Sequence, residues 1–572
     1  MIARRQPFAI LAIASVLVAV SACSRSHDTG AATKSSWDPF VSSFLDRYFA
    51  FRPDVAVNAG RHEFDGRLPD WSADGLTKFG AFLKDQRAKA VAFTADALGD
   101  ARFERDYFVA RIDRDLWWLE TADGPHKNPT YYTDALDPDP YLTRPYAPLE
   151  KRMQSFTAYA RSVVTAAGQI RENLKGPLPR SFIDRARGAF GGFADFYKAD
   201  VPKVFAAVTD SALQRDFVRA NDEAMKAMRD LDAYFETLRP TQTEAFALGP
   251  DLFKSMLYQI ERVDTPLDEL ERIGREDLQR NIAALAMECA AYAPGKSLQD
   301  CMKKMDDRKP SEPTPVAGRR QLATLRQFIL DKNVVSIPGT EEAKVGESPP
   351  YMRWNFAYIS IPGPYETNMP STYYVAPPDP TWTPAEQAEY LPGEADLLFT
   401  SAHEVWPGHF LQFLHANRSP SRFGRVFVGY AFAEGWAHYA EELMWESGFG
   451  NGDPEAHVGQ LSNALLRNAR YLSAIGMHTK GWTMAQAEKL FRDEAYQAPP
   501  TAKQQAARGT FDPEYLDYTL GKLMIRKLRA DWEATRGGKS SRKDFHDRFL
   551  TYGGPPIPMI RNAMMGTTGS LF

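Results

Sequence analysis

The heptapeptide from His403 to His409 (HEVWPGH) contains residues that could bind a metal and activate water. In the H-E-x-x-H signature of zinc proteases, two histidines one helical turn apart bind zinc, and the glutamate activates the metal's water. In this chain Pro407 stands where the second histidine would be. On a continuous helix a step of six residues turns a side chain about 120° away, so His403 and His409 could not share a metal.

Pro407 and Gly408 could resolve this conflict. Proline interrupts the hydrogen bonds of a helix, and glycine accepts the backbone angles that a bulge requires. If the pair is looped out, the motif becomes HExx-(PG)-H and His409 returns to the face of His403. The spacing is equally consistent with a helix that ends at Trp406 and a second helix that contains His409.

A third candidate ligand lies in residues 431–441 (AFAEGWAHYAE). Catalytic zinc usually takes three protein ligands and keeps one position for water. Apolar residues at helical spacing place Glu434, His438 and Glu441 on one face of a predicted helix. A solvated polar face is one interpretation. The flanking aromatic residues favour a buried stripe instead, whose charge a divalent metal would balance.

Four separated segments carry a wider resemblance: 403–410 (HEVWPGHF), 434–441 (EGWAHYAE), 476–483 (GMHTKGWT) and 518–529. In this order they resemble the bacterial DUF885 family, which is similar to the gluzincin metallopeptidases. Weaker matches at 52–54 and 60–62 extend the similarity to most of the chain. The resemblance implies a mainly helical zinc hydrolase in which the PG-interrupted motif is the normal form.

Carried over by position, the resemblance makes His403, His409 and Glu434 ligands of Zn²⁺ and Glu404 the general base. Zinc lowers the pKa of its bound water to about 7. Glu404 would accept the proton of this water and pass it to the leaving amine. The expected reaction is therefore amide hydrolysis without a covalent intermediate.

Two positions depart from the family pattern. His438 stands where an aliphatic residue is more common, and it would support the ligands, contact the substrate or merely be tolerated. Ala474 stands where an aspartate is common, which puts the role of that acid in doubt. Neither change affects the three ligands or the base.

Further candidates come from the C-terminal segments. Tyr518 and His478 could stabilise the oxyanion of the tetrahedral intermediate, as a tyrosine or histidine does in gluzincin-type enzymes. Tyr518 could equally be a phenol at the edge of the core beside Gly521. Arg529 could bind a substrate carboxylate with two hydrogen bonds, although a solvated helix face explains it as well.

Residues 351–380 differ from the helical remainder of the chain. They predict short strands at 358–361 and 371–375 around Pro362-Gly363-Pro364. A small sheet commonly lines the cleft of helical metallopeptidases, and an edge strand here could bind an extended peptide. Tyr373 is then a candidate substrate contact. An aromatic hairpin that only stabilises the fold is the alternative.

The remaining pattern predicts one large helical domain over residues 37–572. Apolar residues at helical spacing predict long helices at 72–121, 148–173, 200–238 and 265–290, and no repeat or long linker divides them. With the resemblance, this predicts a mainly α, metallopeptidase-like fold with a deep central cleft and a small β-sheet lining it.

Local signals mark two helix starts and one connection. Thr265, Pro266 and Asp268 fit the N-cap, N1 and N3 positions of a helix. The sequence Thr383-Pro384-Ala385-Glu386 repeats this pattern ahead of the metal motif. Residues 309–315 are polar and rich in proline, which predicts an exposed connection.

The N-terminus predicts a lipoprotein. Arg4 and Arg5 precede an apolar run from Phe8 to Val20, too short to span a bilayer, which together predict a signal peptide over 1–22. Cys23 at the cleavage point would be lipidated and joined to the domain by a tether over 23–36. Since Ser24 is not the aspartate typical of inner-membrane retention, we expect a periplasmic location at the outer membrane of a Gram-negative bacterium. A cleaved, soluble periplasmic protein is the alternative.

The other cysteines, Cys289 and Cys301, predict a disulfide in an oxidising periplasm. A net charge of −4 gives no basic surplus for nucleic acid. The expected function is a zinc-dependent peptidase that cleaves short peptides in the cell envelope. A lipoprotein that binds peptides without turnover, and a zinc amidase acting on peptidoglycan or a non-peptide amide, are the alternatives. Exopeptidase or endopeptidase mode and oligomeric state are left open.

Overall fold

The computed structural model describes residues 34–94, 98–348, 356–378, 382–537, 541–567 and 569–572. The predicted signal peptide, Cys23 and most of the predicted tether lie outside these residues. In the described part the fold is mainly helical with one small sheet, as predicted. No described helix is both long enough and apolar enough to cross a membrane.

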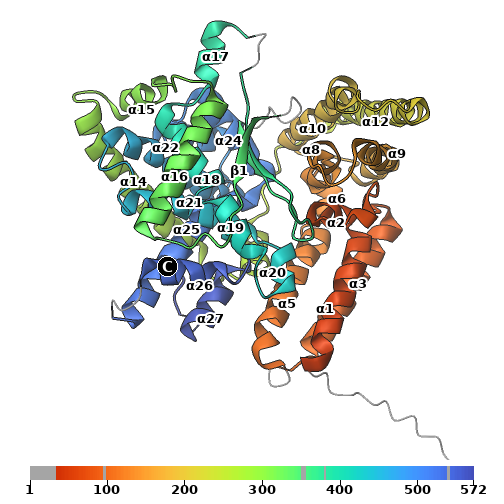
Figure 1. Cartoon of the computed structure of the whole chain (residues 1–572), viewed down its shortest axis with the longest axis horizontal. Coiled ribbons are helices and arrows are strands. Elements are labelled where there is room, and N and C mark those ends of the chain that lie inside the picture. Colours follow the sequence, from red (N-terminus) through yellow and green to blue (C-terminus); the bar gives the residue numbers. More distant parts are fainter. Residues whose placement is uncertain (1–33, 95–97, 349–355, 379–381, 538–540, 568) are drawn as a thin grey trace, which may run out of the picture.

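In the described residues the regular elements of the N-terminal half are helices, drawn in red to yellow on one side of Figure 1. Its helices are α1 (Lys34–Phe51), α2 (Pro53–Ala59), α3 (Ala73–Val91), α5 (Arg102–Leu116), α6 (Gly124–Lys127), α7 (Thr130–Thr133), α8 (Asp139–Thr143), α9 (Leu149–Asn173), α10 (Arg180–Ala199), α11 (Val201–Val204) and α12 (Ser211–Thr237).

The C-terminal half contains the sheet and the metal motif, in green to blue in Figure 1. Up to the motif it comprises α13 (Pro250–Glu261), α14 (Leu267–Tyr292), α15 (Leu298–Asp307), α16 (Thr314–Lys332), β1 (Ala343–Glu347), β2 (Ala357–Ser360), β3 (Ser371–Val375), α17 (Pro384–Tyr390), α18 (Glu394–Glu404) and α19 (His409–Ala416). It continues with α20 (Arg422–Val426), α21 (Tyr430–Glu446), α22 (Pro454–Thr479), α23 (Met484–Asp493), α24 (Pro499–Phe511), the 3-10 turn η7 (Pro513–Leu516), α25 (Asp517–Thr535), α26 (Arg542–Leu550) and α27 (Ile557–Met565).

Each half has its own hydrophobic core, and the two cores exchange residues. Phe423 and Phe427, at α20, pack in the core of the N-terminal half. Trp117, which follows α5, packs in the core of the C-terminal half. The Tyr107 hydroxyl also donates a hydrogen bond to the carbonyl of Phe427. These contacts fix the two halves against each other.

Two of the four predicted long helices are confirmed, and the other two are divided into shorter helices. Residues 148–173 form α9, and residues 265–290 form most of α14. The stretch 200–238 is divided, because Asp210 accepts hydrogen bonds from the Ala212 and Leu213 N–H groups and starts a new helix. The stretch 72–121 is likewise divided between α3 and α5.

The predicted helix starts had different outcomes. Thr383 and Glu386 form a capping box at α17, as predicted. The predicted cap at Thr265 is wrong, because α14 begins at Leu267 and Pro266 takes the N-cap position without a side-chain hydrogen bond. The Pro266 carbonyl instead accepts the first helical bond, from the Leu270 N–H at 3.0 Å.

The sheet has the strand order β1-β3-β2, with β1 parallel and β2 antiparallel to β3. Both predicted strands form, as β2 and β3, whereas β1 was not predicted. Because β1 occupies the second side of β3, the strand of Tyr373 is central and not an edge. Tyr373 is fully buried, and its hydroxyl lies 3.3 Å from Ser401 Oγ on α18. The sheet therefore supports the motif helix through Tyr373.

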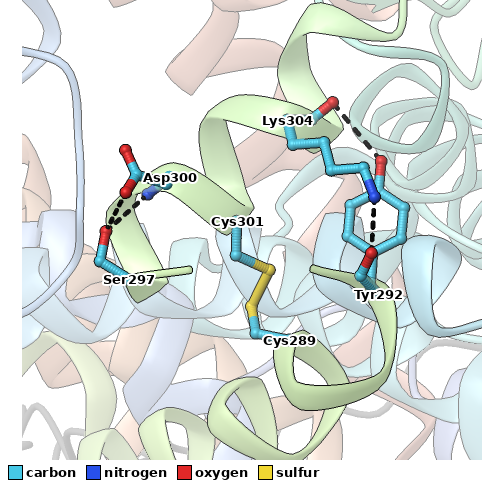
Figure 2. Close-up of a disulfide and its surroundings, with 6 residues drawn as sticks. All are labelled: Cys289, Tyr292, Ser297, Asp300, Cys301 and Lys304. Carbon is cyan, nitrogen blue, oxygen red and sulfur yellow. Dashed lines mark hydrogen bonds between the residues drawn. A yellow bond between two sulfur atoms is a disulfide. The ribbon is translucent and has the colours of Figure 1, made fainter. Parts of the chain in front are cut away.

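The predicted disulfide between Cys289 and Cys301 is present and joins the end of α14 to the start of α15, with 5.8 Å between the Cα atoms (Figure 2). Ser297 caps α15 by accepting the Asp300 N–H. Lys304 donates from Nζ to the Tyr292 carbonyl at 2.6 Å. The turn between the two helices is thus fixed covalently and by hydrogen bonds.

Helices α21 and α25 cross with their backbones in contact at two glycines. A Cβ atom on Gly435 would lie 2.5 Å from Gly521 Cα, and a Cβ atom on Gly521 would lie 2.0 Å from the Ala431 carbonyl oxygen. Neither position accepts a side chain without movement of the backbone. Near this crossing the Tyr430 hydroxyl on α21 lies 3.5 Å from the Tyr518 hydroxyl on α25.

We predict that Gly521→Ala destabilises the fold by about 1–3 kcal/mol or more, because the added methyl group has no space between the helices. Gly168→Ala in α9 is the matched control. No atom lies within 4 Å of its added Cβ, and alanine favours a helix by about 0.5–1 kcal/mol. Urea denaturation measures both variants. Equal shifts in the free energy of unfolding would contradict the close crossing.

Candidate metal centre

The helix that carries the motif is interrupted by two extra residues. Helix α18 ends at Glu404 and α19 begins at His409. Between them the Gly408 N–H donates to the Ala402 carbonyl at 2.9 Å, and the Leu411 N–H donates to the Val405 carbonyl at 3.3 Å. Each bond reaches six residues back, where a regular α-helix reaches four. The chain therefore bulges by two residues and then resumes its helical path, as the looped-out reading expects.

Gly408 and Trp436 hold this bulge in place. A Cβ atom on residue 408 would lie 1.7 Å from the His403 carbonyl oxygen, so only glycine fits there. The Trp436 indole, on α21, donates from Nε1 to the Pro407 carbonyl at 2.9 Å. The bulge is thereby attached to the helix that supplies the third candidate ligand.

The bulge brings His403, His409 and Glu434 together. The Nε2 atoms of His403 and His409 lie 3.3 and 3.4 Å from Glu434 Oε2. Their rings are nearly perpendicular, with centroids 4.7 Å apart. All three donor atoms lie within 4.8 Å of one another.

These residues fit a zinc ion. Glu434 Oε2 is buried and accepts no hydrogen bond from the described residues. Two imidazole nitrogens and one carboxylate oxygen form a known donor set of catalytic zinc. With metal–ligand bonds of about 2.0–2.1 Å, tetrahedral geometry places two donors roughly 3.3–3.4 Å apart. The two N···O separations agree with this value.

A buried ion pair orients His403. Its Nδ1 lies 2.7 Å from Glu441 Oε1, and Arg467 Nη2 lies 3.1 Å from the same oxygen. With Nδ1–H donating to Glu441, the Nε2 lone pair of His403 is directed at Glu434. Such a carboxylate fixes the tautomer of a metal-binding histidine and increases its basicity.

The charges in the cluster depend on one another. Burial and Arg467 lower the pKa of His403, but Glu434 and Glu441 outweigh them and raise it to about 9. Burial would raise the pKa of Glu434, yet the neighbouring His409 and His403 hold it well below its usual range. Burial raises the pKa of Glu404. A carboxylate with a raised pKa is better matched to general base catalysis near neutral pH.

Tyr518 is the second predicted catalytic residue that lies near the cluster. Its ring is almost parallel to the His403 ring, at 6.2 Å between centroids. Its hydroxyl lies 3.5 Å from the Tyr430 hydroxyl, at the start of α21. The glycine crossing of α21 and α25 produces this position.

His478 and Arg529 have other partners. His478 Nε2 donates to the Gly509 carbonyl at 2.7 Å, and its Nδ1 accepts the Leu248 N–H at 3.3 Å. With burial lowering its pKa to about 4, both ring nitrogens of this neutral histidine are used by the backbone. Arg529 pairs with Glu446 at 2.9 Å and lies eleven residues beyond Tyr518 on α25, about 16 Å along the helix. Neither residue has a free group at the cluster.

His438 supports the cluster from inside the core. It is fully buried, and its Nδ1 lies 3.5 Å from Glu441 Oε2. Burial and the nearby Lys522 lower its pKa to about 3, so that it is neutral. Among the interpretations of this departure from the family pattern, a contact with the residues behind the ligands agrees best with its position. Ala474, the other departure, is fully buried on α22.

Sequence reasoning missed the residues that act behind the ligands. The spacing places Glu441 on the face of Glu434, but it does not indicate that Glu441 contacts His403. No local signal marks Arg467, which lies on a different helix. The sequence also gives no indication of a second acidic cluster, Glu261, Glu514 and Asp517, in which all three side chains are buried.

This second cluster lies where α21 and α25 begin. Glu261 Oε1 accepts the Ala431 N–H at 3.3 Å, and Arg114 lies 3.4 Å from Glu514. Burial raises the pKa of Glu261 to about 7, and it also raises the pKa values of Glu514 and Asp517. The buried carboxyl groups therefore favour their protonated forms.

Fold and site together define a mainly helical protein with a largely buried cluster of two histidines and one glutamate. Residues 53–564 match the family described as "Bacterial protein of unknown function (DUF885)", and the chain belongs to this family. No curated protein sequence matches it significantly.

Two solved structures share the fold. One, from Shewanella oneidensis, is described as "a putative lipoprotein of unknown function"; it is 24% identical with a TM-score of 0.74, over 92% of this chain and 99% of that one. The other, "the putative lipoprotein from Colwellia psychrerythraea", is 17% identical with a TM-score of 0.77, over 92% and 98% of the chains. At these identities the similarity shows the architecture alone.

We predict that Glu261→Gln stabilises the protein above pH 7. The folded state keeps this carboxyl protonated up to about pH 7, whereas the unfolded chain loses the proton near pH 4.5. The folded state thus binds more protons between these values, and the stability contributed by Glu261 falls as pH rises. Relative to the unmodified protein, Glu261→Gln should raise the free energy of unfolding by on the order of 1–3 kcal/mol at pH 8, and this gain should vanish near pH 4.

Thermal melts from pH 4 to pH 8 measure this difference. Glu244→Gln is the matched control, because the Glu244 side chain is 67% exposed. A gain that is the same at pH 4 and pH 8 would show that titration of Glu261 is not its cause.

Proposed function

We propose that this protein is a zinc-dependent peptidase of the cell envelope. The observation that carries the proposal is the buried Glu434 Oε2, which accepts no hydrogen bond from the described residues and lies between two histidine Nε2 atoms at the spacing of a tetrahedral metal site. The intact Glu404 beside this cluster supports catalysis over binding alone, since a binding protein needs no general base.

In the proposed reaction the metal, when bound, polarises the scissile carbonyl and acidifies water. Glu404 accepts a proton from this water as its oxygen forms a bond to the carbonyl carbon. Glu404 then passes the proton to the amide nitrogen as the C–N bond breaks, so that an acid and an amine are released. The Tyr518 hydroxyl is the candidate donor to the oxyanion.

We place the protein at the outer membrane through lipid on Cys23. The expected signal peptide supports this location, as do two structural neighbours described as lipoproteins. A peptide or another amide in the periplasm would then be the substrate.

The test is metal content measured together with cleavage of a mixed peptide library. We expect about one zinc per chain, with activity lost on chelation and restored by zinc. Glu404→Gln should keep the zinc and lose roughly 100- to 10,000-fold in rate, because it removes the base. His409→Ala should lose the zinc, whereas His126→Ala, at a side chain that is 49% exposed, should keep it.

Two results would refute the proposal. Full hydrolytic rate in Glu404→Gln would exclude the assigned base, and unchanged zinc affinity in His409→Ala would exclude the ligand set. Zinc binding without cleavage of any peptide would favour the alternatives, a binding protein or an amidase for other amides.

A further inference from the structure

Arg467 and Arg470 lie against the Tyr518 ring, and Arg508 lies nearby at the Tyr430 hydroxyl. Among the described residues, two of these three arginines have an acidic partner and Arg470 does not. Arg467 pairs with Glu441 at 3.1 Å, and Arg508 pairs with Asp512 at 2.9 Å. Arg470 has no carboxylate within ion-pair distance in the part of the chain that the structure describes. A buried charge normally has such a partner, because its desolvation is costly.

Arg470 is held in place by neutral contacts. It is only 8% exposed. Its Nε donates to Gln505 Oε1 at 2.8 Å, and its guanidinium lies 4.8 Å from the centroid of the Tyr518 ring. Both contacts leave the two terminal amino groups without a described acceptor. These contacts orient the guanidinium. Its two terminal amino groups have no described partner, and such groups can bind a carboxylate with two hydrogen bonds.

The surroundings of Arg470 favour an anion. Burial lowers the pKa of Arg470, and the nearby Arg508 lowers it further. Arg508 Nη2 also donates to the Tyr430 hydroxyl at 2.9 Å, and this hydroxyl in turn donates to the Tyr518 hydroxyl at 3.5 Å. A bound carboxylate would balance the excess positive charge in this region.

The separation from the metal cluster limits what such an anion can be. The Tyr518 ring lies 6.2 Å from the His403 ring and 4.8 Å from the Arg470 guanidinium, so these two groups are at most 11.0 Å apart. Each extended residue adds about 3.3–3.6 Å to a peptide. The hydrogen bond between a guanidinium and a carboxylate takes about 2.7–2.9 Å of this distance. A peptide bond at the metal cluster and a carboxylate at Arg470 are therefore separated by at most about two residues.

We propose that Arg470 binds the C-terminal carboxylate of the substrate, so that the enzyme releases one or two residues from the free C-terminus of short peptides. This inference rests on the proposed function and specifies its substrate class. Arg470 takes the role that the sequence suggested for Arg529, which is paired with Glu446.

The test compares two N-acylated peptides of the same sequence, one with a free C-terminal acid and one with a C-terminal amide, using the full zinc-loaded chain. We expect the wild-type enzyme to cleave the acid roughly 10- to 100-fold better in kcat/KM, mainly through KM, because the amide lacks the charge that Arg470 binds. The released product should be a single amino acid or a dipeptide.

Variants then assign the preference to Arg470. Arg470→Gln should reduce the acid-to-amide ratio to near one, and Arg470→Lys should leave an intermediate ratio, because lysine keeps the charge without the planar fork. Arg272→Gln, on the outer face of α14 where Arg272 pairs with Glu269 and Glu276, should keep the wild-type ratio.

The outcomes distinguish failure of the carboxylate site at Arg470 from failure of the proposed peptidase function. If the wild-type enzyme cleaves acid and amide equally, the carboxylate site is wrong and the peptidase stands. If Arg470→Gln slows both substrates by the same factor, Arg470 only supports Tyr518 and the site is also wrong. If the zinc-loaded wild-type protein cleaves neither peptide, nor any in a mixed library, the proposed function itself fails.

Discussion

One buried carboxylate joins the helices of the candidate site. Glu441 on α21 is fully buried, accepts from His403 of α18 and pairs with Arg467 of α22. A charge without solvent must be paired on all sides, so these helices can pack only in the arrangement that completes its contacts. The same contact directs His403 Nε2 towards Glu434. The contacts of Glu441 therefore serve both to pack the core and to orient a candidate metal ligand.

The second determinant is the absence of side chains where helices meet. Gly435 and Gly521 let α21 and α25 touch, and Gly408 lets the bulge touch the carbonyl of His403. The candidate ligands, the candidate base and Tyr518 come from three separate segments, and they converge because backbones approach at these points. The site thus depends on three glycines as much as on its polar residues.

Much of the site could be predicted because its information is local. His403, Glu404 and His409, with two breaker residues before the second histidine, form a short-range pattern, although their spacing alone left a two-helix alternative open. Glu434 joined them through its place on a predicted helix and through the family resemblance. The long helices and the disulfide have local signals too. Contacts between distant segments, such as Arg467 with Glu441 or β1 beside β3, have no periodicity in the sequence and arise only from packing. A local match can also mislead. His478 lies in a segment that resembles the family, yet both of its ring nitrogens form hydrogen bonds with the backbone.

The hydrogen bond from Gly408 to Ala402 also redefines how such proteins can be recognised. A pattern that requires the two histidines to stand four positions apart does not match this chain, in which they stand six positions apart. The structure gives a physical rule in its place: a two-residue insertion is tolerated when the residue before the second histidine is glycine, because that position lies against the first histidine's carbonyl. Sequences of the form H-E-x-x-x-G-H on an amphipathic helix are thus candidates for the same geometry, whatever their overall similarity.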